Sequence, residues 1–330
     1  MSLQPGWHVG GDLLGEDYDS IELPMPGDYE GPVTVRLVRY GPSVASPRGA
    51  VLWVHGFADY FFHTHVAERF AEQGFAFYDL DLRRYGRSLE PHQTPNFCRA
   101  VSEYYPDLDT ALDVITRLDG HQRVIPLAHS TGGLVVPLWH ARLPESRRST
   151  VPAMILNSPF LALPVDSPRR LVRTASHLAV RAMARTSPFR EVPRSGVRLY
   201  GPSLHRGSYG EWDYDLTWKP HDSFPVRSAW LKAVIEGQQR LARRPVDAPT
   251  LVLTSARSLR LTGWVDDARG ADVVLDVVKI REAADRLGPQ VTQAPIEGAL
   301  HDVTLSSPAA RERAFETMFT WLERTLGSPT

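Results

Sequence analysis

The sequence predicts an α/β chain built on a doubly wound, mostly parallel sheet. Short apolar runs alternate with segments of helical period from residue 50 to residue 157. The alternation resumes at 250 and continues to 326. Between these limits, one expected strand (124–128) passes into a helix through the five-residue turn 129–133. Strand–helix alternation of this kind is typical of parallel sheets with helices on both faces.

The expected elements follow one another regularly. Two apolar clusters between Gly and Pro breaks, 21–23 and 33–40, predict an opening antiparallel ribbon. The strands expected in the main sheet are 50–54, 75–82, 124–128, 153–156, 250–255 and 291–295. The helices expected among them are 66–73, 106–118, 134–141, 275–287 and 309–326.

Two prolines conflict with this pattern. Pro126 lies inside an expected central strand, where it removes a hydrogen-bond donor from the ladder. Pro137 lies inside the following helix, where it predicts a break or a kink. The sequence offers no compensation for either residue.

The alternation stops between residues 158 and 247, in a segment rich in Pro, Arg and Trp. This segment leaves the sheet after one strand and returns at the next. It is therefore expected over the carboxyl ends of the strands, where α/β sheets bind ligands. We interpret the chain as a core, 1–157 plus 248–330, with a cap, 158–247.

One stretch of the expected cap, 168–184, has two helical faces. The apolar face consists of Leu171, Ala175, Leu178 and Ala182. The basic face consists of Arg170, Arg173, His177 and Arg181. We expect the apolar face to be buried and the basic face to be solvated. The alternative is that the basic face attracts an anionic substrate or makes a peripheral contact with a lipid surface.

The bulk composition narrows the class of protein. The 330 residues are 42% hydrophobic and carry a net charge of −1, which gives no argument for a nucleic-acid partner. The single cysteine, Cys98, excludes an internal disulfide and a thiolate zinc cluster. No leader pattern and no apolar run approaching the ~20 residues of a membrane span are seen. We expect a reduced, cytoplasmic setting, and only three lysines among 37 basic residues favour a GC-rich bacterial source. The composition does not indicate an oligomeric state.

The turn 129–133 has the form of a nucleophile elbow, G-x-S-x-G, with Ala128 in place of the first glycine. Ala128 and Gly132 flank Ser130 at two residues' distance, where strand and helix backbones need clearance. The serine hydroxyl is then pushed out over the sheet edge, with a helix N-terminus behind it. An aspartate here would indicate dehalogenase or epoxide hydrolase chemistry, and Ser130 argues against both.

A nucleophilic serine needs a base and a third group that orients the base. In folds with this elbow, the chain order is Ser, acid, His, each just after a strand. His301 follows the last expected strand and precedes the last helix, which is the required loop. The other interpretation of His301 is a surface loop histidine.

Four aspartates compete for the role of the acid: Asp266, Asp267, Asp272 and Asp276. We favour Asp272, because it directly precedes a short apolar anchor and a helix start, which would hold it stiffly. Asp276 is expected as the helix N-cap, and Asp266 and Asp267 as solvated loop charges. A loop that folds back to present Asp266 or Asp267 is the alternative.

Acyl transfer also needs N–H donors aimed at the developing oxyanion. Thr131 supplies one from the helix start, and we choose Phe57, after the strand 50–54, for the second. His129 is expected to point away from the site by strand alternation. His63 and His65 form an H-x-H pair with no third ligand, so no metal site is predicted.

Five motifs together resemble the monoacylglycerol lipase / lysophospholipase-like (serine aminopeptidase-like) branch of the α/β-hydrolases. They are His55-Gly56-Phe57, Asp81-x-Arg-x-x-Gly86-x-Ser88, Ala128-His-Ser130-Thr-Gly132-Gly133, Asp272-x-Val-Leu and Gly298-x-x-His301-Asp302. The resemblance covers roughly 30–157 and 248–325. It implies an eight-stranded sheet, a mobile cap, no cofactor, and ester hydrolysis through an acyl-enzyme. It places Ser130, Asp272 and His301 on the catalytic triad, and Phe57 and Thr131 on the oxyanion hole. The sequence departs from the family at Ala128 and in the extra stretch 256–271.

The leading hypothesis is a carboxylic ester hydrolase acting on a small-molecule acyl ester. The alternative is an aminopeptidase or amidase, whose cap should hold a carboxylate for the free amine of the substrate. Candidates for that carboxylate are Glu211, Asp213, Asp215 and Glu236. A third class, a non-catalytic binder, is disfavoured by three triad candidates in the correct order.

Overall fold

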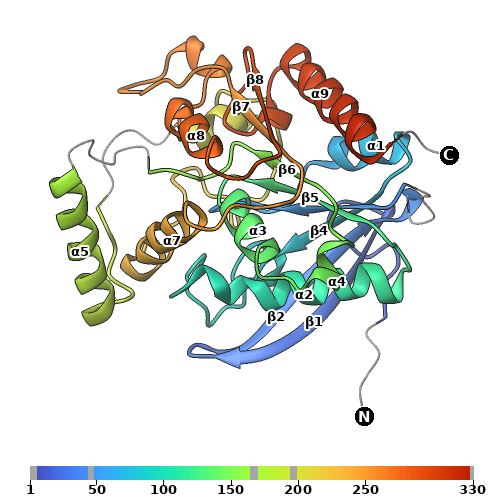
Figure 1. Cartoon of the computed structure of the whole chain (residues 1–330), viewed down its shortest axis with the longest axis horizontal. Helices are drawn as coiled ribbons and strands as arrows, with labels where there is room; N and C mark the ends of the chain where they lie inside the picture. The colour runs from blue at the N-terminus through green and yellow to red at the C-terminus, as the bar shows by residue number, and fades with distance from the viewer. Residues whose placement is uncertain (1–5, 44–47, 164–169, 194–198, 328–330) are drawn as a thin grey trace.

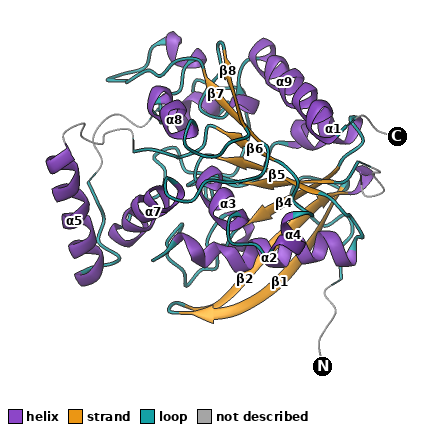
Figure 2. Cartoon of the chain, viewed as in Figure 1, coloured by secondary structure: helices purple, strands orange, loops and turns teal. Residues whose placement is uncertain are grey.

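A single eight-stranded sheet runs through the molecule and carries helices on both faces (Figures 1 and 2). The computed structural model describes residues 6–43, 48–163, 170–193 and 199–327. The strand order is β1-β2-β4-β3-β5-β6-β7-β8. Strand β2 pairs antiparallel with both β1 and β4, and from β4 onward in this order each strand is parallel to the next. The predicted α/β class with a mostly parallel sheet is therefore confirmed.

The bounds of the elements are close to those that the sequence predicts. The strands are β1 Tyr18–Asp28, β2 Gly31–Tyr40, β3 Ala50–Val54, β4 Ala76–Asp81, β5 Val124–His129, β6 Met154–Asn157, β7 Thr250–Ser255 and β8 Val291–Ile296. The helices are α1 Thr64–Glu72, α2 Tyr105–Asp113, α3 Gly132–His140, α4 Glu145–Arg148, α5 Arg170–Thr186, α6 Tyr200–Leu204, α7 Ser228–Leu241, α8 Val277–Ala284 and α9 Pro308–Leu326. Among the described residues, no helix combines the length and the apolar character that a membrane span requires.

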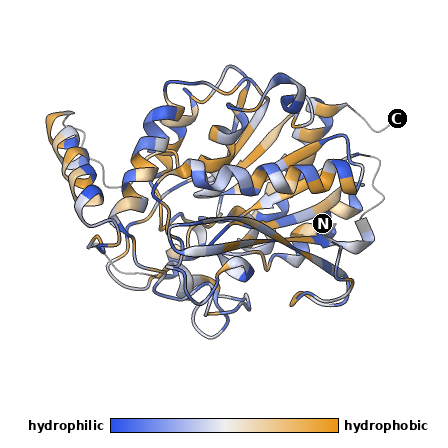
Figure 3. Ribbon diagram, turned by 90° about the horizontal axis from the view of Figure 1, so that it is seen from below, coloured by the Kyte–Doolittle hydropathy of each residue, from blue (hydrophilic) through white to orange (hydrophobic). Residues whose placement is uncertain are grey.

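Each face of the sheet has its own hydrophobic core. On one face α1 and α9 pack against the sheet, for example through Phe70 and Phe315. On the other face α2, α3, α7 and α8 cover the sheet, for example through Leu108 and Trp230. The strands between the two cores are coloured apolar along most of their length in Figure 3. Burial on both faces explains why the strands are continuous apolar runs in the sequence.

Both unexpected prolines are accommodated inside their elements. Pro126 pairs with Leu52 of β3, whereas pairing between β5 and β6 begins one residue later, at Leu127. Two residues earlier, the N–H of Val124 points to the β6 side and donates to Thr150 O. Pro126 lacks the N–H group that would point to the same side, and this gap falls just before the pairing of β5 with β6 begins. Helix α3 continues through Pro137 without a break, and nothing in the structure explains how it tolerates the proline.

Between β6 and β7 lies the long excursion that the sequence predicts; we call residues 158–247 the inserted segment. It contains α5, α6 and α7. Helix α7 packs on the sheet side of the molecule against α3, and α5 packs on α7 at the outer end (Figure 1).

The expected orientation of α5 is wrong. Leu171 is 86% exposed and Leu178 is 56% exposed, so the apolar face looks outward. The basic face turns inward, where Arg181 donates to Glu236 and Gln239 of α7. On the inward side, Glu236 of α7 forms an ion pair with Arg181, Gln239 accepts a hydrogen bond from it, and Ala184 is buried against Ala229 of α7. The helical spacing separates the residues of α5 into two faces but does not show which face is buried. That depends on partners on α7, which the spacing cannot reveal.

The start of α3 lies unusually close to the end of β3. A Cβ atom on Gly132 would lie 2.5 Å from the Val54 carbonyl oxygen and 2.6 Å from that of His55. Backbone atoms cannot move aside as a flexible side chain can. Any larger residue at 132 must therefore push β3 and α3 apart.

We expect Gly132→Ala to lower the free energy of unfolding by about 1–3 kcal/mol, through overpacking against the β3 backbone. The matched control is Gly263→Ala, because a Cβ there meets nothing within 4 Å. Denaturant unfolding of both variants checks this expectation. Equal stability of the two variants would contradict it.

Candidate active site

Ser130 lies at the apex of the turn between β5 and α3. Its φ of +49° is in the left-handed region, which residues with a Cβ rarely adopt. Its N–H donates to Asn157 O at the end of β6, which ties the apex to the neighbouring strand. Strain of this kind persists only where the surroundings fix the backbone, and it concentrates at functional sites. The turn therefore has the geometry of a nucleophile elbow.

A continuous hydrogen-bond chain starts at this serine. Ser130 Oγ lies 3.1 Å from His301 Nε2, and His301 Nδ1 lies 2.8 Å from Asp272 Oδ2. Asp272 and His301 are buried, and Ser130 is 8% exposed. In the neutral imidazole, Nδ1–H donates to the carboxylate and Nε2 accepts the serine hydroxyl. This arrangement can remove the serine proton and stabilise the imidazolium that forms.

The extra stretch 256–271 returns to its starting point and leaves Asp272 beside the end of β7. Asp272 N donates to Arg257 O, and Leu259 N donates to Asp272 O. The second carboxylate oxygen, Oδ1, accepts the N–H groups of Val274 and Leu275, each at 2.8 Å. The side chain is thus held from both ends, and one oxygen is left for His301.

The other aspartates lie elsewhere. Asp276 caps α8 and accepts from Val278 N and Lys279 N. Asp267 is exposed and pairs with Arg257, and Asp266 is exposed as well. Among the four competing carboxylates, Asp272 is the one that the structure places on His301.

Two peptide units are oriented by bonds to their carbonyl oxygens. His55 Nδ1 lies 2.8 Å from Gly56 O, and the peptide that contains this oxygen also carries the Phe57 N–H. Phe160 N donates at 2.8 Å to Ser130 O, and that peptide carries the Thr131 N–H. Because the peptide is planar, fixing the carbonyl fixes the direction of the N–H on its opposite side. Both expected oxyanion donors are therefore held in a set direction.

His55 is itself fixed, which the sequence did not indicate. Its Nε2 accepts the Leu82 N–H at 3.0 Å, so Nδ1 carries the proton that goes to Gly56 O. Burial lowers the pKa of His55, which keeps the ring neutral and this tautomer in place.

A buried polar cluster supports the loop of His301. Asp302 accepts from Asn157 Nδ2, from Thr304 N and from His63 Nε2, at 2.7, 2.9 and 3.0 Å. Burial alone would raise the pKa of Asp302, but His129, whose ring is charged only at low pH, and the hydrogen bond from His63 hold that pKa well below its usual range. Sequence reasoning missed this role of His63, because 239 residues separate the two partners. The sequence does show an acidic residue, Asp302, directly after His301, and this residue could have indicated a buried polar partner.

The expectation that His129 points away from the site is wrong. Its ring lies 4.9 Å from the ring of His301, and its Nδ1 bonds to Asn157 O. Burial lowers the pKa of His129 to about 4, so the ring is uncharged at neutral pH. A neutral neighbour does not oppose the positive charge that His301 acquires as a base.

The H-x-H pair is engaged in hydrogen bonds. His63 bonds to Asp302, and His65 Nε2 donates to Thr304 O at 2.9 Å. Within the described ranges, no group of three or more His, Cys, Asp or Glu side chains is placed to hold a metal ion.

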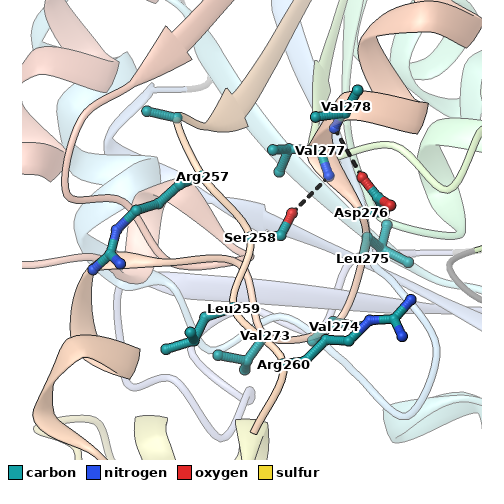
Figure 4. Close-up of a pocket in the computed structure, with 11 residues that line it drawn as sticks. Arg257, Ser258, Leu259, Arg260, Val273, Val274, Leu275, Asp276, Val277 and Val278 are labelled. Carbon is teal, nitrogen blue, oxygen red and sulfur yellow. Dashed lines mark hydrogen bonds between the residues drawn. The ribbon is translucent and has the colours of Figure 1, made fainter.

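A cavity of about 400 Å³ lies beside the loop of the acid but outside the hydrogen-bond chain (Figure 4). Its walls are residues 256–260 and 273–278. None of the three residues Ser130, Asp272 and His301 lines it. This cavity therefore does not bring a ligand to the serine.

The sheet, the elbow and the hydrogen-bond chain together define an α/β-hydrolase. The chain belongs to the family described as serine aminopeptidase, S33, whose pattern matches residues 45–307. A curated relative, the monoacylglycerol lipase of Mycolicibacterium smegmatis, is 35% identical over 115 residues. The match covers 34% of this chain and 38% of that relative. The resemblance to the monoacylglycerol lipase branch is confirmed.

Solved structures of lipases and esterases share the fold. The monoacylglycerol lipase of Paleococcus ferrophilus aligns with a TM-score of 0.62 at 17% identity, over 85% of this chain and 96% of that chain. The carboxyl esterase of Bacillus coagulans aligns with a TM-score of 0.63 at 14% identity, over 93% of this chain and 99% of that chain. At these identities the likeness establishes the fold.

We expect Ser130→Ala to fold like the parent protein and to lose at least about 10³-fold in kcat on an ester substrate. No neighbouring side chain can replace the hydroxyl that lies 3.1 Å from His301. Steady-state kinetics with a thermal melt as folding control check this. A pure variant that retains more than a few per cent of the activity would rule out Ser130 as nucleophile.

Asp272→Asn should keep the fold and lower kcat by about 10³-fold or more, since an amide stabilises the imidazolium poorly. Asp276→Asn is the matched control, because asparagine caps a helix about as well as aspartate. Kinetics of both variants under the same conditions test the assignment. A tolerant Asp272→Asn, together with a large loss in Asp266→Asn or Asp267→Asn, would assign the acid to the exposed loop instead.

Proposed function

We propose that the protein is a carboxylic ester hydrolase that works through an acyl-enzyme on Ser130. The observation that carries the proposal is the hydrogen-bond chain from Ser130 through His301 to Asp272. It stands next to two peptide N–H groups, of Phe57 and Thr131, whose directions are fixed. Nucleophile, base, orienting acid and oxyanion donors are the parts that acyl transfer requires.

The reaction follows from this geometry in two halves. His301 takes the proton of Ser130 as Oγ attacks the ester carbonyl, and the carbonyl oxygen becomes an oxyanion between the Phe57 and Thr131 N–H groups. The proton then passes from His301 to the leaving alcohol, and an acyl-enzyme remains. Water, deprotonated by the same His301, attacks the acyl-enzyme and releases the acid. Asp272 stays ionised throughout and stabilises the imidazolium.

The inserted segment acts as a cap in this proposal. Aromatic rings from both parts of the chain meet beside the oxyanion donors: Trp230 of α7 lies 4.4 Å from Phe57 and 6.3 Å from Phe160, between ring centroids. Such a wall favours an apolar acyl chain over a charged group. The name of the M. smegmatis relative, a monoacylglycerol lipase, agrees with an acyl ester as substrate. Because Ser130 is nearly buried, substrate entry requires the cap to move.

The amidase alternative needs a cap carboxylate close to the serine. Glu236 of α7 is paired with Arg181 of α5 and with Lys232 of α7. Asp213 is paired with Arg206, and its side chain is largely exposed. Asp215 accepts from Thr217 N, and Glu211 lies 3.7 Å from Arg311. Each of these four carboxylates has a partner of its own and none bonds to Ser130, His301 or Asp272, so they give the amidase no support.

A panel of p-nitrophenyl esters of increasing acyl length, with aminoacyl anilides beside them, tests the proposal. We expect hydrolysis of the esters and a kcat/KM at least about 10²-fold lower on the anilides, a difference of about 2.7 kcal/mol in transition-state stabilisation. Labelling of Ser130 by a phosphonate is the control for an active serine. Preference for the anilides would favour the amidase, and activity that survives in Ser130→Ala would overturn both.

A further inference from the structure

Outside the hydrogen-bond chain of Ser130, a buried ion pair joins the inserted segment to the core. Lys219 Nζ lies 2.5 Å from Asp59 Oδ1, and the two side chains are 6% and 2% exposed. The residues are 160 positions apart in the sequence. Burial alone would raise the pKa of Asp59, but the Lys219 ammonium outweighs it and holds that pKa at about 2. The Asp59 carboxyl group is therefore ionised at neutral pH, inside the protein.

The pair reaches the oxyanion loop through the second oxygen of Asp59. Asp59 Oδ2 accepts the Gly56 N–H at 3.2 Å, while the carbonyl of the same glycine receives the bond from His55. On the other side of Phe57, the Ala58 N–H donates to Asn96 Oδ1 at 2.8 Å. The peptide that carries the Phe57 N–H thus lies between two anchored neighbours. One of these anchors, Asp59, is itself bonded to Lys219 of the inserted segment.

A buried ion pair is a poor device for stability alone. Removing two charges from water is costly, and well-packed apolar side chains of similar volume often stabilise a protein as well or better. A charged lysine does achieve something that an apolar residue cannot. It holds the carboxylate of Asp59 ionised and in one rotamer, so that Oδ2 stays aimed at Gly56.

The surroundings of Lys219 link the pair to the other half of the site. The rings of Phe62, Tyr200 and Tyr214 lie 5.6 to 5.8 Å from Nζ. The ring of Tyr200 also lies 5.3 Å from that of His301, and Tyr200 Oη accepts the Asp302 N–H. The same part of the inserted segment therefore contacts both the oxyanion loop and the loop of the base.

We propose that Lys219 is a positioning residue for the oxyanion hole and acts through Asp59 on the peptide that carries the Phe57 N–H. The proposal rests on the proposed function, in which that N–H receives the oxyanion. Lys219 touches no reacting atom. It sets where one donor lies, and so contributes to the transition state more than to substrate binding.

The test compares Lys219→Met, Asp59→Asn and the double variant with the parent protein. Removing one oxyanion donor costs about 10²–10³ in kcat, so displacing one should lower kcat by about tenfold to a hundredfold, with KM within about twofold. Affinity for a trifluoromethyl ketone, which forms an oxyanion on the serine, should fall in parallel with kcat. Because the two residues act in one chain, the double variant should lose about as much as Lys219→Met alone.

The double variant guards against misfolding, since it leaves no unpaired buried charge. Trp212→Phe is the matched control: it removes the bond from Trp212 Nε1 to Leu305 O, which ties the same part of the inserted segment to the core. We expect Trp212→Phe to keep kcat and ketone affinity near those of the parent. If it loses as much as Lys219→Met, the pair only docks the segment and the proposal is overturned.

Two other outcomes would also overturn the positioning role. One is an unchanged kcat in both the Lys219→Met and the double variant. The other is a rise in KM with ketone affinity unchanged. Phosphonate labelling separates this test from the proposed function. A parent protein that is labelled at Ser130 but cleaves no ester overturns the function, and labelling rates of the variants still decide the role of Lys219.

Discussion

The close approach of three backbones at Ser130 determines the rest of the site. The end of β5, the start of α3 and the end of β3 come so near that Gly132 has no room for a Cβ atom. Ser130, at the apex of the same turn, has a left-handed backbone conformation, and its hydroxyl faces His301. The close approach also brings the loop after β3 beside the start of α3, so that the Phe57 and Thr131 N–H groups come from two different segments. The strand, the turn and the helix are therefore fixed together by this close approach, which requires small residues beside Ser130.

Much of the fold follows from local patterns in the sequence. Strands that are covered on both faces read as apolar runs, and β7 has the bounds that its run predicts. The position of the inserted segment is visible in the sequence, but its internal fold could not be predicted. Its helices pack partly on one another and show no regular alternation with strands. Helix α5 shows the limit most clearly. Its two faces are visible in the sequence, but which of them turns inward depends on Glu236 and Gln239, on a different helix.

The residues of the site also fall into those that local sequence predicts and those that only the tertiary fold brings together. Ser130 and His301 are recognisable from their places after strands, and Asp272 from its place directly before a short apolar anchor and a helix start. The groups that support them are not recognisable. His63 meets Asp302, and Lys219 meets Asp59, across long separations that no local pattern encodes. Local chemistry thus indicates which residues react, whereas the tertiary fold decides which residues hold them.

The contacts of residues 200–219 with the core bear on how modular this enzyme is. In the proposed function, exchange of the segment between β6 and β7 is an obvious route to a new substrate preference, since it would leave the sheet, the elbow, Ser130, His301 and Asp272 untouched. Here the same segment supplies Tyr200 to the loop of His301 and Lys219 to the loop of Phe57. A graft that replaced all of it would remove supports of the proposed catalytic groups together with Trp230, which we propose as part of the acyl-chain wall. The boundary between scaffold and recognition element therefore runs inside the inserted segment, with 200–219 on the scaffold side and α7, which carries Trp230, on the recognition side.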